Sequence, residues 1–383
     1  MRVFILAGEP SGDKLGGALM QGLRALSPDV TFEGVGGAEM QAQGLRSRFP
    51  MSELSVMGLA EILPKYQALK ARIQETADAV LAMKPDVLIT IDSPDFSFRV
   101  AKKVKAKSQI RTVHYVAPTV WAWRPGRAQK ISHFIDHLLA VLPFEPPLFE
   151  RHGMRCDFVG HPVVAEPQAS EAEAAAFREG LGLGTAPVLL VLPGSRQGEV
   201  ARLCRIFGDV AAALKAQHPD VEVVLPAAAP VAGLVRDLTR HWSLPVHILN
   251  PTIGEAETNT AAKRAAFKAA DVALAASGTV SLELAAARTP MVVAYRMNPI
   301  TFRLIKAMAL VDTVTLVNLV SQTRSVPEFL GPECLAGNIA ASLADVLQHP
   351  DGQLAAMNET MALLGEGGEA PGLRAARAVL AGL

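Results

Sequence analysis

Short apolar runs alternate with longer amphipathic segments along most of the chain. The apolar runs predict strands of a parallel sheet, because such strands are covered on both faces and read as continuous hydrophobic stretches. Residues spaced at helical periodicity predict helices between them. The expected strands lie at 2–7, 31–35, 87–91, 111–116, 137–141, 157–159, 188–192, 222–225, 246–249, 272–276 and 291–294. The expected helices include 16–26, 66–83, 98–107, 171–179, 200–217 and 280–287.

This alternation predicts an α/β fold with two doubly wound, Rossmann-like domains that face a cleft. The length of 383 residues also favours two domains over one. A stretch rich in Gly and Pro at 160–167 marks the boundary, so we expect a first domain at 1–165 and a second at 166–340. Residues 341–383 are rich in Ala and Leu without a further apolar run. They predict a helical tail, which we expect to pack back on the first domain.

Composition and charge narrow the function classes. Lys plus Arg and Asp plus Glu both number 37, which argues against a nucleic-acid binder held by bulk charge. The chain has three well-separated cysteines, which fit a reducing cytosol. No apolar run approaches the roughly 18 residues that span a bilayer. The sequence has no Asp-x-Asp pair, metal-type His/Cys cluster or Gly-x-Ser-x-Gly motif, so we expect no metal, no cofactor and no serine hydrolase.

Two turns in the second domain have the pattern of phosphate sites. Each follows an apolar run and precedes a helical segment, and the first N–H groups of a helix attract anions. The first turn adds a cation, and an acid lies one helical turn behind the second. These features predict a bound nucleotide diphosphate, with the candidate residues Gly194, Ser195, Arg196, Ser277, Gly278, Thr279 and Glu283.

Loops after the strands of the first domain carry candidates for the acceptor side. Asp92 follows an expected strand and fits a general base, although capping of the next helix is an equally ordinary role for an acid there. Ser11 and Asp13 follow the first strand and fit either a substrate contact or a helix cap. Trp121 and Arg124 lie in a loop with two tryptophans and fit a sugar ring and a phosphate, with an aromatic core cluster as the alternative.

One amphipathic segment of the first domain indicates a membrane contact. Its apolar residues recur at helical spacing, with cations at its flank. A helix that faces the core is the ordinary alternative. The residues expected to meet acyl chains or a membrane surface are Ile62, Leu63, Tyr66 and Leu69.

Several motifs in this order resemble the lipid-A-disaccharide synthase family. They are Ala-Gly-Glu-Pro-Ser-Gly-Asp at 7–13, Ile-Asp-Ser-Pro-Asp-Phe at 91–96, Val-Trp-Ala-Trp-Arg at 120–124, Leu-Pro-Gly-Ser-Arg at 192–196, and Ser-Gly-Thr at 277–279 followed by Leu-Glu at 282–283. The resemblance runs from Met1 to about Leu335. The chain departs from the family after its late asparagine, where Val320-Ser321-Gln322 stands in place of Leu-Ala-Gly.

The resemblance implies an inverting glycosyltransferase of the B-type fold. Such an enzyme joins UDP-2,3-diacylglucosamine to 2,3-diacylglucosamine 1-phosphate through a β-1,6 bond and releases UDP, in the synthesis of lipid A. It implies Asp92 as base, Arg196 at the diphosphate, Glu283 at the ribose and Asn318 in a late nucleotide-side loop. The family acts at the cytoplasmic face of the inner membrane of Gram-negative bacteria, so membrane lipids are expected partners and nucleic acid is not. A homodimer stays an open alternative.

Two other functions fit the same residues. A UDP-sugar 2-epimerase shares the layout and the nucleotide half, but its soluble substrates give it no use for an apolar patch. A nucleotide-sensing membrane module would need Arg196 and Glu283 but not Asp92. Products formed from the two acylated sugars would discriminate among the three.

Overall fold

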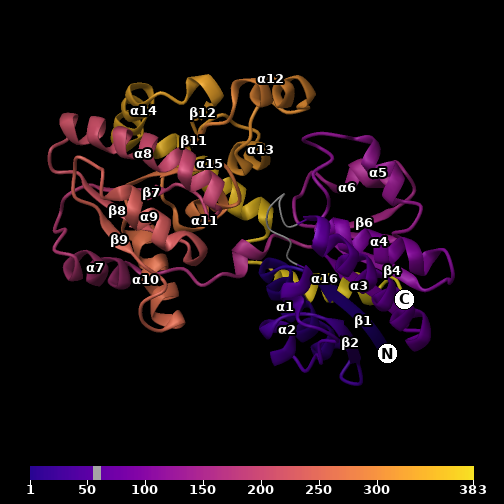
Figure 1. Cartoon of the computed structure of the whole chain (residues 1–383). Coiled ribbons are helices and arrows are strands. Elements are labelled where there is room, and N and C mark those ends of the chain that lie inside the picture. The colour runs from indigo at the N-terminus through magenta and orange to yellow at the C-terminus, as the bar shows by residue number, and fades with distance from the viewer. Residues whose placement is uncertain (55–61) are drawn as a thin grey trace. The chain divides into compact units, whose positions relative to one another are not determined.

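The computed structural model describes the backbone of residues 1–54 and 62–383, and the side chains of these residues except 62–66. The chain divides into two compact units. The first contains Met1–Ala165 together with Leu364–Leu383, and the second contains Glu166–Leu363 (Figure 1). Each unit has its own six-stranded parallel sheet.

The sheet of the first unit has the order β2-β1-β3-β4-β5-β6. After β2 the chain returns past β1 to form β3, so the strand order reverses between β1 and β3. Ligands of such sheets bind beyond the carboxyl ends of the strands at this reversal. The strands are β1 (Arg2–Ala7), β2 (Thr31–Val35), β3 (Val87–Ile91), β4 (Arg111–Tyr115), β5 (His137–Ala140) and β6 (Arg155–Phe158).

The helices of the first unit connect these strands. They are α1 (Pro10–Leu26), α2 (Ala38–Ala42), α3 (Ile62–Met83), α4 (Pro94–Lys105), α5 (Gly126–Ile131) and α6 (Pro146–Glu150), with short 3₁₀ helices η1 (Met51–Leu54) and η3 (Pro162–Ala165). Helix α16 (Pro371–Leu380) packs closely on α1. The approach needs glycine on both helices: a Cβ at Gly22 would lie 2.6 Å from the Gly372 carbonyl oxygen, and one at Gly372 would lie 2.6 Å from the Ala18 carbonyl oxygen.

The sheet of the second unit has the order β12-β11-β10-β7-β8-β9, and its strand order reverses between β7 and β10. Its strands are β7 (Val188–Leu192), β8 (Glu222–Pro226), β9 (His247–Leu249), β10 (Val272–Ala275), β11 (Met291–Tyr295) and β12 (Glu328–Leu330). Its helices are α7 (Glu171–Gly180), α8 (Gln197–Gln217), α9 (Ala232–Thr239), α10 (Ala256–Ala269), α11 (Val280–Ala287), α12 (Pro299–Met308), α13 (Leu316–Ser321), α14 (Ala336–Gln348) and α15 (Asp351–Leu364). The short 3₁₀ helices are η4 (Ala229–Val231) and η5 (Gly331–Glu333).

The central strands are buried along their whole length, as their apolar composition predicts. Every residue of β3 and of β7 is buried. The α/β class and the two Rossmann-like sheets predicted from the sequence are therefore confirmed. Helices α1, α4 and α8 begin three to six residues before the predicted positions, because their first turns hold Pro, Gly and polar residues that lack apolar periodicity.

The C-terminal region differs in part from the expectation. Residues 341–363 belong to the second unit with α14 and α15, and only the segment from Leu364 onward packs on the first. Strand β12 was not predicted, because three half-buried residues are too few to give a recognisable pattern. In the part of the chain that the structure describes, no helix has both the length and the apolar character to cross a membrane.

Candidate functional site

The turn after β3 in the first unit holds Asp92 in an unusual backbone conformation. Asp92 and Ser93 have φ angles of 48° and 44°, in the left-handed region that residues with a Cβ seldom adopt. The Asp92 N–H donates to the Tyr115 carbonyl (3.0 Å), and the Ser97 hydroxyl donates to the Asp92 carbonyl (2.8 Å). Two left-handed residues in succession cost about 1–3 kcal/mol each and concentrate at functional sites.

The loops after the neighbouring strands meet this turn. A Cβ at Gly8, directly after β1, would lie 2.5 Å from the Ser93 hydroxyl, so only glycine lets the first loop approach so closely. Val116, directly after β4, has a φ of 80°, which is a strained value for a β-branched residue. The loops after β1, β3 and β4 therefore lie together at the carboxyl ends of three adjacent strands, and each has a tightly constrained backbone. The Asp92 carboxylate lies there, half-buried and with no hydrogen bond to the described residues.

Helix α4 begins at Pro94, with Ser93 at the N-cap position. Asp95 therefore lies in the first turn of the helix and does not cap it. An acid in the first turn interacts favourably with the helix dipole. Because the helix starts four residues earlier than its apolar pattern indicates, neither Asp92 nor Asp95 occupies the N-cap position.

The Asp13 side chain caps a helix, which is one of its two expected roles, but the helix is α2 and not the helix that carries Asp13. Its side chain is buried, and its carboxylate accepts hydrogen bonds from the N–H groups of Gly37 (2.7 Å), Glu39 (2.9 Å) and Met40 (3.1 Å). The carboxylate thus satisfies the start of α2, a helix far from it in sequence. Ser11, in contrast, is exposed in the first turn of α1.

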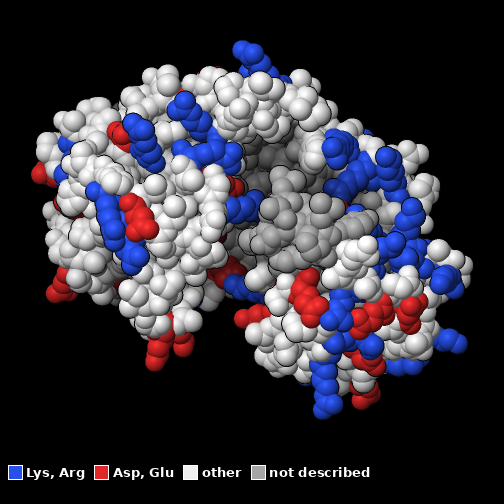
Figure 2. Space-filling model, viewed as in Figure 1, with Lys and Arg blue, Asp and Glu red and all other residues white. Residues whose placement is uncertain are grey.

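The aromatic loop after β4 is part buried and part exposed. The Trp121 indole N–H donates to the Glu145 carboxylate (3.2 Å), and the Leu142 N–H donates to the same group (3.0 Å). Burial raises the pKa of Glu145 to about 7. Arg124 is exposed, and its guanidinium stacks on the Trp123 ring at 4.2 Å. Figure 2 shows that Lys and Arg side chains gather around this loop, over α4 and α5.

Of the four residues expected to meet a membrane, only Leu69 lies in the part of the chain whose side chains the structure describes. The side chains of Ile62, Leu63 and Tyr66 lie outside the described residues. Leu69, on α3, is half-buried and packs against the core of the first unit. Leu69 therefore exposes less apolar surface to a membrane than its place in the apolar pattern indicated.

The second unit has a cavity of about 440 Å³ beyond the carboxyl ends of β7, β8 and β10, at the reversal of strand order. Both predicted phosphate turns line it, and so does Glu283. Gly194 and Gly278 have φ angles of 111° and 153°, which the turns between strand and helix require. The N-termini of α8 and α11 follow these turns, so their first N–H groups supply positive charge at this edge of the sheet. The full lining is Leu192, Gly194, Ser195, Arg196, Glu199, Pro226, Ala227, Ala228, Lys263, Phe267, Ala276, Ser277, Gly278, Thr279, Val280 and Glu283.

Arg196 is the N-cap residue of α8 and extends into solvent. Its side chain is 77% exposed, and its guanidinium lies 3.7 Å from the Glu199 carboxylate. A Cβ at Gly194 would lie 2.7 Å from the same carboxylate, so Glu199 fits over this glycine. A guanidinium held by one loose ion pair can turn to an anionic ligand at small cost.

Sequence reasoning missed Lys263 and Phe267, which enter the cavity from α10. The Lys263 ammonium lies 2.6 Å from the Glu283 carboxylate and 5.1 Å from the centre of the Phe267 ring. The two missed residues are four apart on one helix and so share a face. That spacing alone gives no sign that the face points to a ligand.

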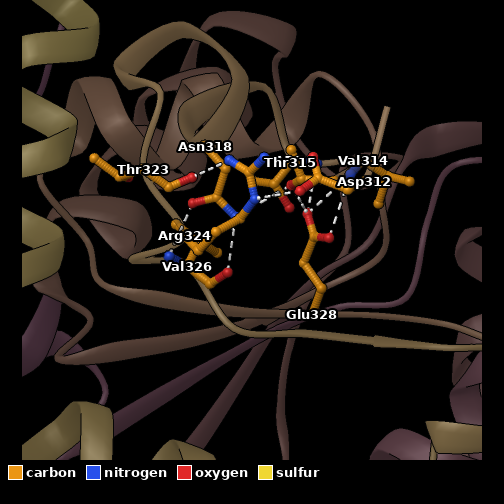
Figure 3. Close-up of polar contacts among 9 residues, drawn as sticks. Asp312, Val314, Thr315, Asn318, Thr323, Arg324, Val326 and Glu328 are labelled. Carbon is orange, nitrogen blue, oxygen red and sulfur yellow. Dashed lines mark hydrogen bonds and ion pairs between the residues drawn. The ribbon is translucent and has the colours of Figure 1, made fainter. Parts of the chain in front are cut away.

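Asn318 is not among the residues that line this cavity. Its side chain is buried, and its amide pairs with the backbone of Val326, donating to the carbonyl (2.9 Å) and accepting from the N–H (3.0 Å) (Figure 3). The amide also donates to the Thr313 hydroxyl (3.2 Å). The polar atoms of the Asn318 side chain are thus satisfied within the loop, and the nucleotide-side role that the resemblance implies for Asn318 stays a prediction.

Other residues of this loop are also held by hydrogen bonds. The Glu328 carboxylate accepts from the Thr313 hydroxyl (2.6 Å) and from the N–H groups of Val314 (3.0 Å) and Thr315 (2.7 Å). Gln322, which stands where the family has Gly, ends α13 with a φ of 55°. Helices commonly end in this conformation, usually with Gly. Gln322 therefore adopts a conformation that Gly would adopt with less strain.

Comparisons with known proteins agree with the motifs. A family model described as lipid-A-disaccharide synthetase matches residues 3–369. A lipid-A-disaccharide synthase of Ruegeria pomeroyi is 64% identical over 381 residues, which cover 99% of this chain and 95% of the relative. That of Rhodospirillum centenum is 46% identical, with 99% and 94% covered.

Among solved structures, a UDP-GlcNAc 2-epimerase from Neisseria meningitidis bound to UDP-GlcNAc has a TM-score of 0.65 and 13% identity, and covers 100% of this chain and 99% of its own. That likeness concerns the fold alone. The family model and the two relatives span nearly the whole chain, and on this basis the chain belongs to the lipid-A-disaccharide synthase family.

Proposed function

We propose that this protein transfers a diacylated glucosamine from UDP to 2,3-diacylglucosamine 1-phosphate, forming a β-1,6 bond and releasing UDP. Membership of the family supports the reaction. The proposal that UDP-sugar binds to the second unit rests on its cavity, where two helix N-termini, Arg196 and Glu283 surround one space. A diphosphate and a ribose need these groups, since the first is an anion and the second offers hydroxyl donors.

The reaction is proposed as a single displacement with inversion. The acceptor 6-hydroxyl attacks the anomeric carbon of the donor sugar as the bond to the UDP oxygen breaks, and Asp92 takes the hydroxyl proton. Negative charge grows on the leaving diphosphate. Arg196 and the N–H groups at the starts of α8 and α11 stabilise that charge more strongly in the transition state than in the bound donor, which accelerates the step.

The donor site needs no rearrangement of its backbone in this proposal. The turns at Gly194 and Gly278 already have the left-handed or extended geometry that exposes N–H groups. Glu283 is about 43% exposed, so its carboxylate can accept hydrogen bonds from two ribose hydroxyls. Lys263 holds that carboxylate in position before the nucleotide binds.

The transfer is tested by incubating the purified protein with UDP-2,3-diacylglucosamine and 2,3-diacylglucosamine 1-phosphate. Formation of a β-1,6 disaccharide with one UDP per bond is the expected result. A changed configuration at C2 with no disaccharide would favour an epimerase, and binding of UDP with no turnover would favour a nucleotide sensor. Either outcome overturns the proposal.

We expect Glu283→Ala to weaken UDP binding about tenfold to a hundredfold. A hydrogen bond to a charged group contributes about 1.5–3 kcal/mol. Titration calorimetry with UDP measures the change. Glu257→Ala, which removes an exposed acid from the first turn of α10, is the matched control and should leave the affinity unchanged. Equal affinities of the Glu283→Ala and wild-type proteins would contradict the ribose role.

Both substrates carry acyl chains, so we propose that the segment from Ile62 to Leu69 docks at the membrane surface, with inner-membrane lipids as partners on the cytoplasmic face. Replacing Leu63 and Leu69 with Ser should move the protein from vesicle pellets to the supernatant. Thermal unfolding is followed in parallel, because Leu69 also packs on the core. Leu63→Ser alone separates the two effects, and unchanged sedimentation of both variants would count against this docking.

A further inference from the structure

A buried acid contacts the loop between β4 and α5 of the first unit, residues 116–125, which we call the tryptophan loop. This acid is Glu145, in the loop after β5, and its exposed fraction is only 1%. An acid is seldom buried so completely unless its side chain has specific partners. The proposed displacement does not use Glu145, so its partners indicate what the acid does.

The Glu145 carboxylate joins two loops at the same end of the sheet. Its Oε1 atom accepts from the Trp121 indole N–H (3.2 Å), and its Oε2 atom accepts from the Leu142 N–H (3.0 Å). The Phe144 ring packs edge-on against the Trp121 ring, with centroids 5.6 Å apart. Trp121 is therefore the residue through which the loop after β5 holds the tryptophan loop.

The tryptophan loop begins beside the proposed base. Strands β3 and β4 pair with Ile91 opposite Tyr115, and the Asp92 N–H donates to the Tyr115 carbonyl (3.0 Å). Strand β5 follows β4 in the sheet. The turn of Asp92, the tryptophan loop and the loop of Glu145 thus follow the carboxyl ends of three neighbouring strands. A shift of Trp121 would move the loop that adjoins Asp92.

Two residues after Trp121, the tryptophan loop presents an exposed aromatic residue and a cation. Trp123 is 38% exposed, and the Arg124 guanidinium carbon lies 4.2 Å from the centre of its ring. Arg124 has a φ of 51°, and its guanidinium makes no hydrogen bond to the residues that the structure describes. An aromatic side chain suits a sugar ring and a guanidinium suits a phosphate, and the proposed acceptor has both groups.

We propose that Glu145 is a positioning residue, which holds the tryptophan loop so that Trp123 and Arg124 bind the sugar phosphate of the acceptor. The role rests on the proposed transfer and extends it to the acceptor. It requires the ionised acid, because each carboxylate oxygen accepts from one N–H group. A protonated acid or an amide would present a donor to one of these N–H groups and would lose that bond.

The bond to Trp121 is the one expected to break. The Leu142 N–H is buried and cannot reach water, whereas Trp121 is half-buried and can turn outward. Burial raises the pKa of Glu145 to about 7, so this acid changes its charge in a range that is convenient for assays. Burial and the charges of Glu145, Glu150 on α6 and Asp157 on β6 raise the pKa of the Cys156 thiol on β6, so that thiol stays neutral there.

The first test compares Glu145→Gln with the wild type at about pH 8, where the acid is ionised. The KM for 2,3-diacylglucosamine 1-phosphate should rise about threefold to tenfold, the effect of one lost hydrogen bond, with kcat and the affinity for UDP nearly unchanged. Glu150→Gln, at an exposed position on α6, is the matched control and should behave as the wild type does. A wild-type KM for Glu145→Gln would overturn the proposal.

The pH dependence gives a second readout. The ratio of the two KM values, Glu145→Gln over wild type, should fall toward one below about pH 6, because the wild-type acid is then protonated and loses the same bond. Titration of the substrates affects both proteins and cancels in the ratio. A ratio above one that does not change with pH would overturn the role of the ionised acid.

A double-mutant cycle tests whether Glu145 acts through Trp121. Trp121→Phe removes the indole N–H and keeps an aromatic ring beside Phe144. The double variant Glu145→Gln, Trp121→Phe should then have the same acceptor KM as Trp121→Phe alone. Effects that multiply would overturn the coupling. Arg124→Gln should raise this KM about tenfold or more, since hydrogen bonds between charged groups are stronger, and an unchanged KM would overturn the acceptor contact.

Stability separates positioning from a loss of the fold. The raised pKa means that the folded chain holds the proton more tightly than the unfolded chain, so Glu145 favours folding less as the pH rises to about 7. Glu145→Gln has no charge to bury, and its unfolding temperature at about pH 8 should be no lower than that of the wild type. A lower unfolding temperature together with a raised KM would mean that the acid supports the fold and would overturn the proposal.

A measurement without substrate distinguishes failure of the positioning role from failure of the proposed transfer. The chain has three tryptophans, whose indole N–H signals can be followed by NMR after isotope labelling. The Trp121 signal, identified by its loss in Trp121→Phe, should shift with a midpoint at about pH 7 in the wild type and lose that shift in Glu145→Gln. Trp242 of the second unit is the internal reference. A Trp121 signal without this midpoint overturns the positioning role, whereas a wild-type chain that forms no disaccharide overturns the transfer.

Discussion

The Asp92→Asn variant is expected to lose about two to four orders of magnitude in kcat while its affinity for UDP stays at the wild-type value. General base catalysis by a positioned side chain typically contributes a factor of this size. An amide has nearly the shape of the carboxylate but cannot take the proton from the acceptor hydroxyl. Turnover of the two acylated sugars and calorimetry with UDP provide the two measurements.

The backbone at this position makes Asn the appropriate replacement. Asn, like Asp, tolerates the left-handed region, so the turn with φ of 48° at position 92 should form in the variant. An alanine there would add strain to the loss of the carboxylate and would mix the two effects. Asp95→Asn is the matched control, because it removes an exposed acid three residues later in the first turn of α4.

Two results would contradict the role of Asp92. A kcat near the wild-type value would exclude it as the base. Equal losses in kcat and in thermal stability would mean that the side chain mainly supports the turn. The control variant distinguishes a general charge effect from a specific one, since Asp95→Asn changes the charge by the same amount.

The sequence predicted the framework because parallel strands leave a strong signal. Strands such as β3 and β7 are buried on both faces, so their residues are apolar without interruption, and their bounds were predicted correctly. The loop at each strand end then follows from topology, which is why residues as far apart as Ser195 and Ser277 were correctly expected to lie together. Membership of the lipid-A-disaccharide synthase family, suggested by the motifs, is confirmed.

Polar side chains were harder to predict, because their partners lie far away in sequence. Asp13 caps α2, which begins 25 residues later, and no local pattern distinguishes that bond from a bond to a substrate. Asn318 matches a family motif, yet its amide is satisfied by Val326 and Thr313. Lys263 was missed for the converse reason, since an exposed lysine on a helix ordinarily indicates solvent.

Exposure of an apolar face is also invisible to periodicity. The apolar residues of α12 have the same helical spacing as residues that pack on a core, and only the structure shows that Leu304 is 58% exposed. Leu69 is the opposite case: its segment was expected to meet a membrane, and the structure packs the Leu69 side chain against the core of the first unit. Amphipathic spacing therefore predicts a helix with two faces, and the tertiary structure decides what each face contacts.

Arg196→Ala is expected to lower kcat about 10²–10³-fold, with a smaller effect on UDP affinity. Removal of one preorganised donor from a developing negative charge typically costs about 2.7–4 kcal/mol of barrier. The side chain is 77% exposed and only loosely paired with Glu199, so its loss should leave the thermal unfolding temperature nearly unchanged. Steady-state kinetics with both acylated sugars measures the effect.

Comparison of three variants then shows whether the charge or the forked geometry of Arg196 matters. Arg196→Lys keeps the charge but loses the paired donors that match a phosphate, and it should fall between the wild type and Arg196→Ala. Arg236→Ala, at an exposed position on α9, controls for the loss of a surface cation and should leave kcat unchanged. A near-normal kcat of Arg196→Ala would exclude the guanidinium from stabilising the leaving diphosphate and would leave that role to the N–H groups at the starts of α8 and α11. Equal losses in kcat/KM and in UDP affinity, with kcat unchanged, would show instead that Arg196 stabilises the donor complex and the transition state by the same amount. Arg196 would then contribute to donor binding and not to the chemical step.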